Sequence, residues 1–193
     1  GVGKCSLEAG RALEEILGDR IAGGIVVDVH VGKLSRLETY AGTHPFPTPP
    51  NVDATKKIIR MLTGLSEKDT VLFIISGGGS TLLCQPQDHT CEDEANILRC
   101  LSEGGADIHE INTLRKHTSL ARGGQLARYA YPAQVISLIF SDVPGAELAF
   151  IASGPTVRDE TTTSNAQEIL EKYAIRAKCR LPKLELIETP KDE

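Results

Sequence analysis

The amino-acid sequence predicts an α/β fold, in which a mostly parallel sheet is doubly wound with helices on both of its faces. Short apolar runs rich in β-branched residues, such as residues 71–75, are typical of strands buried on both faces, as in parallel sheets. Stretches with apolar residues three and four apart alternate with these runs and indicate amphipathic helices. Polar, glycine-rich segments follow several of the runs, at the edge where open α/β sheets bind ligands.

The composition indicates one globular domain and excludes several classes of protein. Of the 193 residues, 40% are apolar and 24% are charged, which is typical of a globular chain and not of a disordered one. The net charge of −5, without a basic patch that carries interleaved aromatic residues, argues against nucleic-acid binding. No apolar run approaches the ~20 residues that span a bilayer, so the sequence excludes membrane insertion.

The five cysteines form no CxxC motif and have no nearby pair of histidines at zinc-ligand spacing. They therefore indicate neither a zinc site nor a redox motif, and they favour a reducing, cytoplasmic compartment. The chain opens with Gly-Val-Gly-Lys and has no initiator methionine, so we expect it to be a piece of a longer protein.

The first predicted helix spans residues 4–17, where apolar residues recur at helical spacing, and Gly18 supplies a stop. Lys4 lies in its first turn, although the helix dipole disfavours a cation there by up to about 1 kcal/mol. Lys4 either points to solvent, which is the commoner case, or shares this end of the helix with a bound anion. The opening GVGKCS differs from a phosphate-binding P-loop, which requires Ser or Thr directly after the lysine, where this chain has Cys5.

Residues 24–31 and 37–41 are predicted to form two further strands. The proline-rich residues 42–50 then exclude regular structure and form a rigid loop. This loop carries His44. A lone loop histidine is more often solvated than bound to a ligand, and both alternatives stay open here. Asn51 is expected to cap the helix that follows.

The stretch on which the fold prediction depends most is the strand at residues 71–75 together with the loop that follows it, SGGGS from Ser76 to Ser80. Three consecutive residues without Cβ can adopt positive φ and turn their N–H groups toward one point, which makes an anion cradle. The two serines add donors for phosphate or carboxylate oxygens. The alternative is a tight turn from strand to helix that simply requires glycine, and the loop alone does not decide between the two.

A helical pattern over residues 114–130 carries four cationic side chains within eight residues, namely Arg115, Lys116, His117 and Arg122. They form either a solvated face, as charge runs commonly do, or a binding surface. Gly123 and Gly124 interrupt the pattern at a cost of about 1 kcal/mol each relative to alanine, so we expect another group to approach the backbone closely there. Before this segment, Thr90 is expected to cap a helix that ends at Gly104.

The last predicted strand spans residues 135–140 and, like the others, is expected to be buried. It leads to Asp142, a position from which a carboxylate can hold Mg²⁺ or orient a hydroxyl group. Residues 153–156 form a second small-residue loop that can cradle an anion. A helix is predicted from residue 161 to 173, and periodicity then fades over residues 176–193, which indicates a linker or tail.

Glycine loops, clustered cations and an aspartate at one sheet edge suit phosphoryl transfer. This reaction depends on positioning and charge neutralisation more than on a strong nucleophile of the protein. The sequence does not indicate a Ser-His-Asp catalytic triad, because Ser80 does not lie in a G-x-S-x-G elbow.

Seven blocks of sequence are more specific than any one loop. They are GVGK at the start, AGTHPFP from Ala41, SGGGSTLL from Ser76, EINTLRKHTSLARGGQLA from Glu110, SDVPG from Ser141, IASGPTVRDETT from Ile151 and ETPK from Glu188. In this order they resemble the N-terminal domain of the glycerate 2-kinase (MOFRL) family, and the resemblance covers essentially the whole chain.

The resemblance implies an ATP-dependent kinase that uses Mg²⁺ to phosphorylate the 2-hydroxyl of D-glycerate in a cleft between a Rossmann-like domain and a C-terminal domain. Residues 1–175 would form the Rossmann-like domain, and residues 176–193 a linker or tail toward the C-terminal one. Lys4 becomes the expected catalytic lysine and Asp142 the expected metal ligand. The resemblance further implies a pocket for glycerate and phosphate groups that consists of Ser76, Gly77, Gly78, Gly79, Ser80, Asn112, Arg115, Lys116, Ser153, Gly154 and Thr156.

The chain departs from the family pattern at several positions. Ala146 and Glu147 stand where an acidic pair is usual, Thr43 and Thr48 replace a glycine and an acidic residue, and Arg122 stands where lysine is usual. The chain also stops at ETPKDE, where the family continues into its second domain. We therefore expect weak or no kinase activity from these residues alone.

Two other functions stay open. A degenerate homologue would retain a small-anion pocket without catalysis, and a different phosphotransferase would use the same fold for another hydroxy acid. The expected partners are D-glycerate, ATP and the missing C-terminal domain, while the sequence leaves the oligomeric state open.

Overall fold

The computed structural model describes residues 1–141 and 147–191 and has an α/β fold with parallel strands. Strand β1 (Gly24–Asp28) pairs in parallel with β2 (Leu37–Ala41), and β3 (Thr70–Ser76) pairs in parallel with β4 (Gln134–Phe140). Val2 forms parallel bridges to Val27 of β1 and to Ile75 of β3, so it joins the two pairs. The α/β class with parallel strands is therefore confirmed, whereas a doubly wound, Rossmann-like sheet stays a prediction, because each sheet has only two strands in the described residues.

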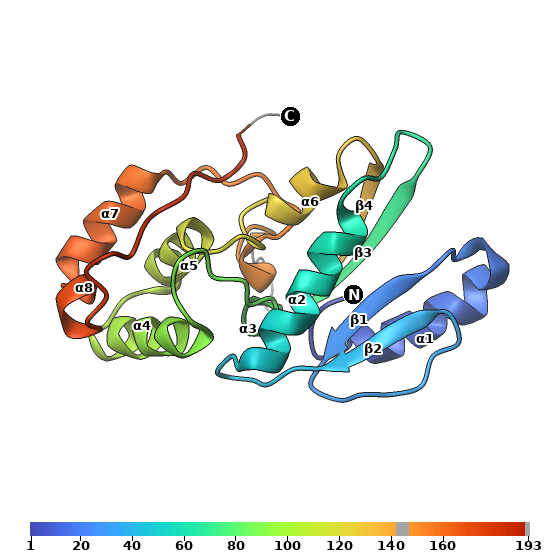
Figure 1. Cartoon of the computed structure of the whole chain (residues 1–193), viewed down its shortest axis with the longest axis horizontal. Coiled ribbons are helices and arrows are strands. Elements are labelled where there is room, and N and C mark those ends of the chain that lie inside the picture. Colours follow the sequence, from blue (N-terminus) through green and yellow to red (C-terminus); the bar gives the residue numbers. More distant parts are fainter. Residues whose placement is uncertain (142–146, 192–193) are drawn as a thin grey trace.

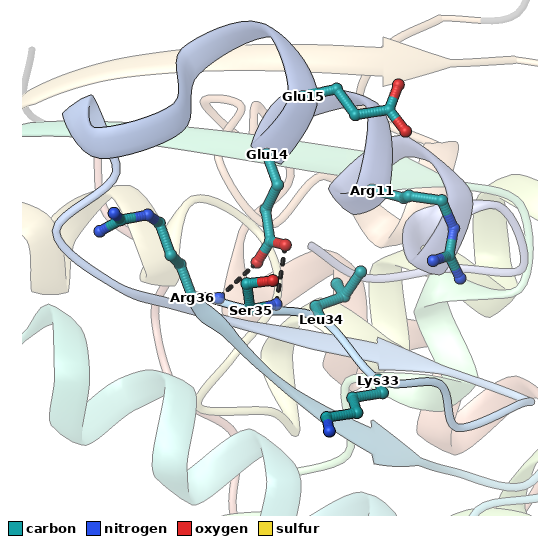
Figure 2. A pocket seen from close by; sticks show the side chains of 7 residues that line it. All are labelled: Arg11, Glu14, Glu15, Lys33, Leu34, Ser35 and Arg36. Atoms are coloured by element: carbon teal, nitrogen blue, oxygen red, sulfur yellow. Dashed lines mark hydrogen bonds between the residues drawn. The ribbon is translucent and has the colours of Figure 1, made fainter.

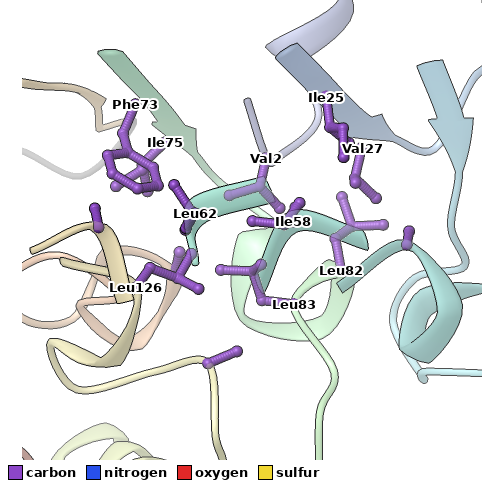
Figure 3. Packing of buried hydrophobic residues seen from close by; sticks show 14 residues of the cluster. Val2, Ile25, Val27, Ile58, Leu62, Phe73, Ile75, Leu82, Leu83 and Leu126 are labelled. Carbon is purple, nitrogen blue, oxygen red and sulfur yellow. The ribbon is translucent and has the colours of Figure 1, made fainter. Parts of the chain in front are cut away.

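Two long helices cover opposite faces of the first strand pair. Gly10 of α1 (Ser6–Leu17) packs against Val26, whereas Ala54 and Ile58 of α2 (Pro49–Leu62) share a core cluster with Val27. Because successive side chains of a strand point to opposite faces, α1 and α2 lie on the two sides of β1. Figure 3 shows the cluster on the α2 side, with Val2 between the strand pairs.

A second core lies among the helices at the left of Figure 1. It is enclosed by α4 (Cys91–Glu103), α5 (Ile108–His117), α7 (Thr163–Lys172) and α8 (Ile175–Lys178). Leu184, beyond α8, is only 4% exposed within this core. Residues 176–191, which the sequence assigns to a linker or tail, thus contribute to the core, and the division at residue 175 stays a prediction.

Most helix ends follow the local signals. Gly18 ends α1 with a positive φ and begins the short 3₁₀ turn η1 (Gly18–Arg20), and Thr90 caps α4 by accepting a hydrogen bond from the Asp93 N–H. The cap predicted at Asn51 is wrong, because the N-cap of α2 is Thr48 and Asn51 lies at the third helical position. Two prolines occupy the first turn, which suits their fixed φ and missing N–H.

The helical pattern of residues 114–130 divides into two helices. Gly123 and Gly124 have φ of +58° and +86° and separate α5 from α6 (Gln125–Ala130). A Cβ on Gly124 would lie 3.2 Å from the carbonyl oxygen of Val157, and the Gly124 N–H donates to Gly154 O at 2.8 Å. The expected close approach to this backbone is confirmed.

The prediction that the last strand is buried on both faces is wrong. Ile136, Leu138 and Phe140 of β4 are 43%, 41% and 48% exposed, and only the alternate residues are partly buried. Within the described residues β4 pairs with β3 alone and so lies at the edge of its sheet, with the face that carries Ile136, Leu138 and Phe140 exposed. Among the described helices, moreover, no span is apolar and long enough to cross a membrane.

Candidate functional site

The glycine loop runs from the end of β3 into the short helix α3 (Gly79–Leu82). Gly78 has a φ of +83°, and a Cβ there would lie 3.1 Å from Cε of Lys4. A Cβ on Gly79 would lie 2.6 Å from the Cβ of Ala152 in the 3₁₀ turn η2 (Ile151–Ser153). Both positions therefore require glycine, and the glycine loop is enclosed between the start of α1 and η2.

Lys4 is exposed and lies over the glycine loop. Its backbone N–H donates to Gly77 O at 3.0 Å, and its side chain passes over Gly78. Ser76 is buried at 3% exposure, and its Oγ accepts from the Cys5 N–H at 3.3 Å. The Ser76 hydroxyl thus ties the loop to the beginning of α1, whereas the sequence predicts that it binds the ligand.

His44 lies on the same side of Gly78 as Lys4. A Cβ on Gly78 would be 3.3 Å from the His44 ring carbon Cδ2. The proline-rich loop is fixed here because Thr81 Oγ1 donates to Pro45 O at 3.2 Å, and because Asn51 Nδ2 donates to Thr81 O at 3.1 Å. Partial burial lowers the pKa of His44, and the positive charges of Lys4 and Arg115 lower it further.

Arg115, from α5, supplies a second positive charge that acts on His44. Its Nε is buried without a hydrogen-bond partner, and the guanidinium makes no ion pair with any described residue. Burial lowers the pKa of Arg115 to about 10, and the charge of Arg122 contributes to this shift. A guanidinium that is partly desolvated and unpaired is a natural anchor for a carboxylate or phosphate. We refer to the cations Lys4 and Arg115, together with the His44 imidazole whose pKa they lower, as the cation cluster.

Arg122 is paired and does not belong to the cation cluster. Its side chain is fully buried, and Nη2 contacts Glu94 Oε1 at 2.6 Å and the Ser80 carbonyl oxygen. Burial raises the pKa of Glu94, but the charge and hydrogen bond of Arg122 lower it more, so the pKa lies below its ordinary value. Sequence reasoning missed this pair, because Glu94 and Arg122 lie 28 residues apart.

Three predicted polar residues from different parts of the chain meet beside the loop. Ser153 Oγ donates to Asn112 Oδ1 at 2.6 Å and lies 3.2 Å from Ser80 Oγ. Gly154, which has a φ of +58°, follows directly. The structure thus brings Ser80, Asn112 and Ser153 together at the glycine loop, as the resemblance implies.

The remaining predicted residues lie elsewhere or outside the described part. Lys116 Nζ binds Asp159 Oδ1 at 3.0 Å in a buried ion pair, so its charge is already neutralised. Thr156 Oγ1 lies 2.8 Å from the hydroxyl of Ser137 on β4. Asp142 falls outside the described residues. Within residues 1–141 and 147–191, no group of three or more His, Cys, Asp or Glu side chains is arranged to hold a metal ion.

A separate hollow of about 330 Å³ lies between α1 and the segment that precedes β2 (Figure 2). Its central acidic side chain is Glu14, whose carboxylate accepts from the backbone N–H groups of Ser35, Arg36 and Leu37 at 2.6–2.9 Å. These backbone hydrogen bonds lower the pKa of Glu14. Glu14 therefore fastens α1 to the connection between the strands, and the hollow contains none of the predicted site residues.

Comparisons with known proteins identify relatives of this chain. Residues 1–186 match the family model described as "Domain of unknown function (DUF4147)". A D-glycerate 2-kinase of Thermotoga maritima is 39% identical over 194 residues, which cover 98% of this chain and 46% of the relative. A glycerate 2-kinase of Pyrococcus horikoshii is 42% identical over 176 residues, or 90% of this chain and 40% of the relative.

The fold is similar to a solved structure as well. A crystal structure of the Thermotoga maritima glycerate kinase superposes with a TM-score of 0.89 at 35% identity, covering all of this chain and 48% of that one. The chain thus spans about half the length of the relatives it matches. Both the family model and these relatives cover nearly all of its residues, and the chain belongs to the DUF4147 family, which includes proteins named glycerate 2-kinase.

Proposed function

We propose that this chain is the N-terminal part of a glycerate kinase, which transfers a phosphoryl group from ATP to the 2-hydroxyl of D-glycerate and releases 2-phosphoglycerate. The relatives that bear this name support the reaction class. The observation that carries the proposal is the cation cluster, in which Lys4 and His44 lie against Gly78, the charge of Arg115 acts on His44, and neither Lys4 nor Arg115 forms an ion pair with a described residue. An unpaired group of positive charges at a glycine loop suits a substrate with a carboxylate and, after reaction, a phosphate.

Each part of the site has a proposed role. Arg115 anchors the glycerate carboxylate, because its guanidinium has an unpaired N–H and is partly shielded from water. Lys4 neutralises charge on the phosphoryl oxygens as they transfer, which is the main requirement of this chemistry. The Ser80, Asn112 and Ser153 side chains, which already form one hydrogen-bonded group, orient the substrate hydroxyls.

Mg²⁺, when bound, would neutralise the phosphate groups of ATP, and we retain Asp142 as its proposed ligand. We also propose that the site is completed by a C-terminal domain of the same protein. Transfer by this chain alone is then expected to be weak or absent, because half of the cleft would be missing.

Binding of 2-phosphoglycerate to the 193-residue chain, measured by isothermal titration calorimetry, tests the cation cluster. We expect Arg115→Met to weaken binding about 10- to 100-fold, the usual effect of losing a charged hydrogen bond. Arg11→Met is the matched control, because Arg11 lies on α1 with an exposed side chain and pairs with Glu8. Equal affinity of the two variants would refute the proposed pocket.

Catalysis is tested separately, by following ADP release from ATP and D-glycerate. The full-length protein that contains this chain should turn over, and its Lys4→Ala variant should lose most of its activity while still binding 2-phosphoglycerate. A full-length protein that binds 2-phosphoglycerate but transfers no phosphate would contradict the kinase and favour a binding-only homologue. Robust turnover by the 193 residues alone would contradict the need for a second domain.

A further inference from the structure

Two cysteines that are distant in sequence meet in the second core. Cys100 lies in the last turn of α4 and Cys179 directly after α8, and their Sγ atoms are 3.0 Å apart across 79 residues of sequence. The other thiols with a hydrogen bond contact carboxylates instead. Cys84 Sγ lies 3.4 Å from Glu94, and Cys91 Sγ lies 3.2 Å from Glu92.

Rigid backbone holds both members of the pair. The Cys179 N–H donates to Ile175 O at 2.8 Å, and the Gly104 N–H donates to Cys100 O at 3.0 Å. The Arg176 guanidinium, on α8, donates to Leu184 O at 2.9 Å and to Gln167 Oε1 at 3.0 Å, which fixes α8 against α7 and the following segment. The two sulfur atoms therefore meet because packed helices bring them together, and a bond between them requires only a small movement.

The two thiols differ in accessibility. Cys179 is buried, at 6% exposure, whereas Cys100 is only partly buried. Burial and the neighbouring Cys100 raise the pKa of Cys179 to about 12, which disfavours its thiolate while the pair is reduced. The thiolate is the species that attacks a disulfide, and it is disfavoured at Cys179. Because Cys100 is also the more accessible of the two, we expect Cys100 to react first with a reagent from solution.

We propose that Cys100 and Cys179 are a site of reversible oxidation, at which a small-molecule disulfide such as oxidised glutathione converts the dithiol to an intrachain disulfide. The Cys100 thiolate attacks one sulfur of the reagent, breaks its S–S bond and releases one thiolate. Cys179 then loses its proton to solvent and attacks Cys100 Sγ, which releases the second thiol. Two protein thiols are oxidised, and one reagent disulfide is reduced to two thiols.

The bond would fasten the C-terminal segment to α4. Residues 180–191 run from Cys179 back to α5. The Ile187 N–H donates to His117 O of α5 at 2.8 Å, and Thr189 Oγ1 donates at 3.1 Å to Oδ2 of Asp159. A crosslink at the start of this segment closes a long loop, so it should restrict the unfolded chain more than the folded one. We expect the oxidised protein to unfold at a temperature roughly 5–10 °C higher than the reduced protein.

The experiment treats the reduced full chain with oxidised glutathione and measures free thiols, intact mass and tryptic peptides. Of the five thiols in the sequence, two should disappear without added glutathione mass, and a peptide pair that joins Cys100 to Cys179 should appear. Cys100→Ser and Cys179→Ser should each abolish the crosslink and the thermal shift, whereas Cys5→Ser should retain both.

A glutathione adduct that persists at Cys100, a crosslink to another cysteine, or five unreacted thiols would each overturn the proposal. If Cys179→Ser is destabilised when reduced, Cys179→Ala keeps the apolar packing and serves as the second variant. None of these measurements depends on kinase activity, so the proposed function and this site are tested independently.

Discussion

Whether a basic side chain already has a partner decides whether it can bind a ligand at the candidate site. Four such side chains lie on α5 or shortly after it. Lys116 is neutralised by Asp159, and Arg122 by Glu94. His117 is buried, with Nδ1 2.8 Å from the carbonyl oxygen of Ile187. Among these four, Arg115 alone has no partner within the described residues, and its charge is the one that acts on His44. The run of charges in the sequence is therefore mostly a structural network, and one member is left to bind a ligand.

The coupling within the cation cluster gives a prediction at the scale of single residues. Lys4→Ala should raise the pKa of His44, because removing a nearby positive charge stabilises the imidazolium, and the rise should be larger at low ionic strength. Titration of the His44 ring protons by NMR measures this shift. Lys33→Ala removes another exposed lysine and should leave the His44 pKa unchanged. A His44 pKa that is the same in the wild type and in Lys4→Ala would show that the cluster is not formed.

The sequence indicated some of the polar side chains that lie together, but not which charged side chains form pairs. Ser80, Asn112 and Ser153 were assigned to one pocket through the resemblance, and they do share hydrogen bonds. The acidic partners were missed: Asp159 lies 43 residues from Lys116, and Glu94 lies 28 residues from Arg122. Charge patterns along the chain show only near neighbours, so pairing over such separations is not visible in them.

At the scale of elements, the glycine loop is defined by what packs against it. Gly79 packs against Ala152, which lies in η2 with a φ of +54°. A Cβ added to Gly79 would clash with the Cβ of Ala152. Gly79→Ala should destabilise the protein by about 1–3 kcal/mol, the usual cost of overpacking, and should weaken 2-phosphoglycerate binding as the loop shifts. Urea unfolding measures the stability change.

The matched control for this substitution is Gly23→Ala. A Cβ at Gly23 would meet no atom within 4 Å, and Gly23 has no positive φ. Its effect should stay within about 0.5 kcal/mol, as for most surface changes. A Gly79→Ala protein as stable as Gly23→Ala would mean that the contact with η2 is not a constraint.

Local signals predicted elements well where propensity and packing agree. Residues 37–41 were predicted as a strand, and β2 has these bounds, while Thr90 and Gly104 flank α4 as expected. Helix α5 begins at Ile108 behind a cap at Asp107, ahead of the helical pattern predicted over residues 114–130. The apolar run of β4 was read as fully buried, because composition does not reveal whether a strand lies at the edge of its sheet.

At the scale of the whole molecule, a buried polar centre joins α5 to the C-terminal segment. Asp159, at 1% exposure, accepts from Lys116 and Thr161, and from Thr189 near the end of the described chain. Lys191 Nζ donates to the Asp159 carbonyl oxygen at 2.7 Å. The sequence predicts a linker or tail over residues 176–193, because periodicity fades there. These long-range hydrogen bonds instead hold Thr189 and Lys191 to Asp159, which is paired with Lys116 of α5.

This centre predicts how stability depends on pH. Burial raises the pKa of Asp159, but the charge of Lys116 and its hydrogen bonds to Lys116 and Thr161 lower it more, so the folded pKa lies below the unfolded value of about 3.9. A carboxyl group with a lowered folded pKa stabilises the protein above its unfolded pKa, and this stability is lost as pH falls through the folded pKa. Asp159→Asn should therefore cost about 3–5 kcal/mol at pH 7, because Lys116 stays buried without its partner, and should flatten the loss of stability below pH ~4.

Urea unfolding between pH 2 and pH 7 measures both effects, with the exposed neighbour Glu160→Gln as control. If Asp159→Asn is as stable as that control, or loses stability in acid as steeply as the wild type, then Asp159 does not hold the two segments together.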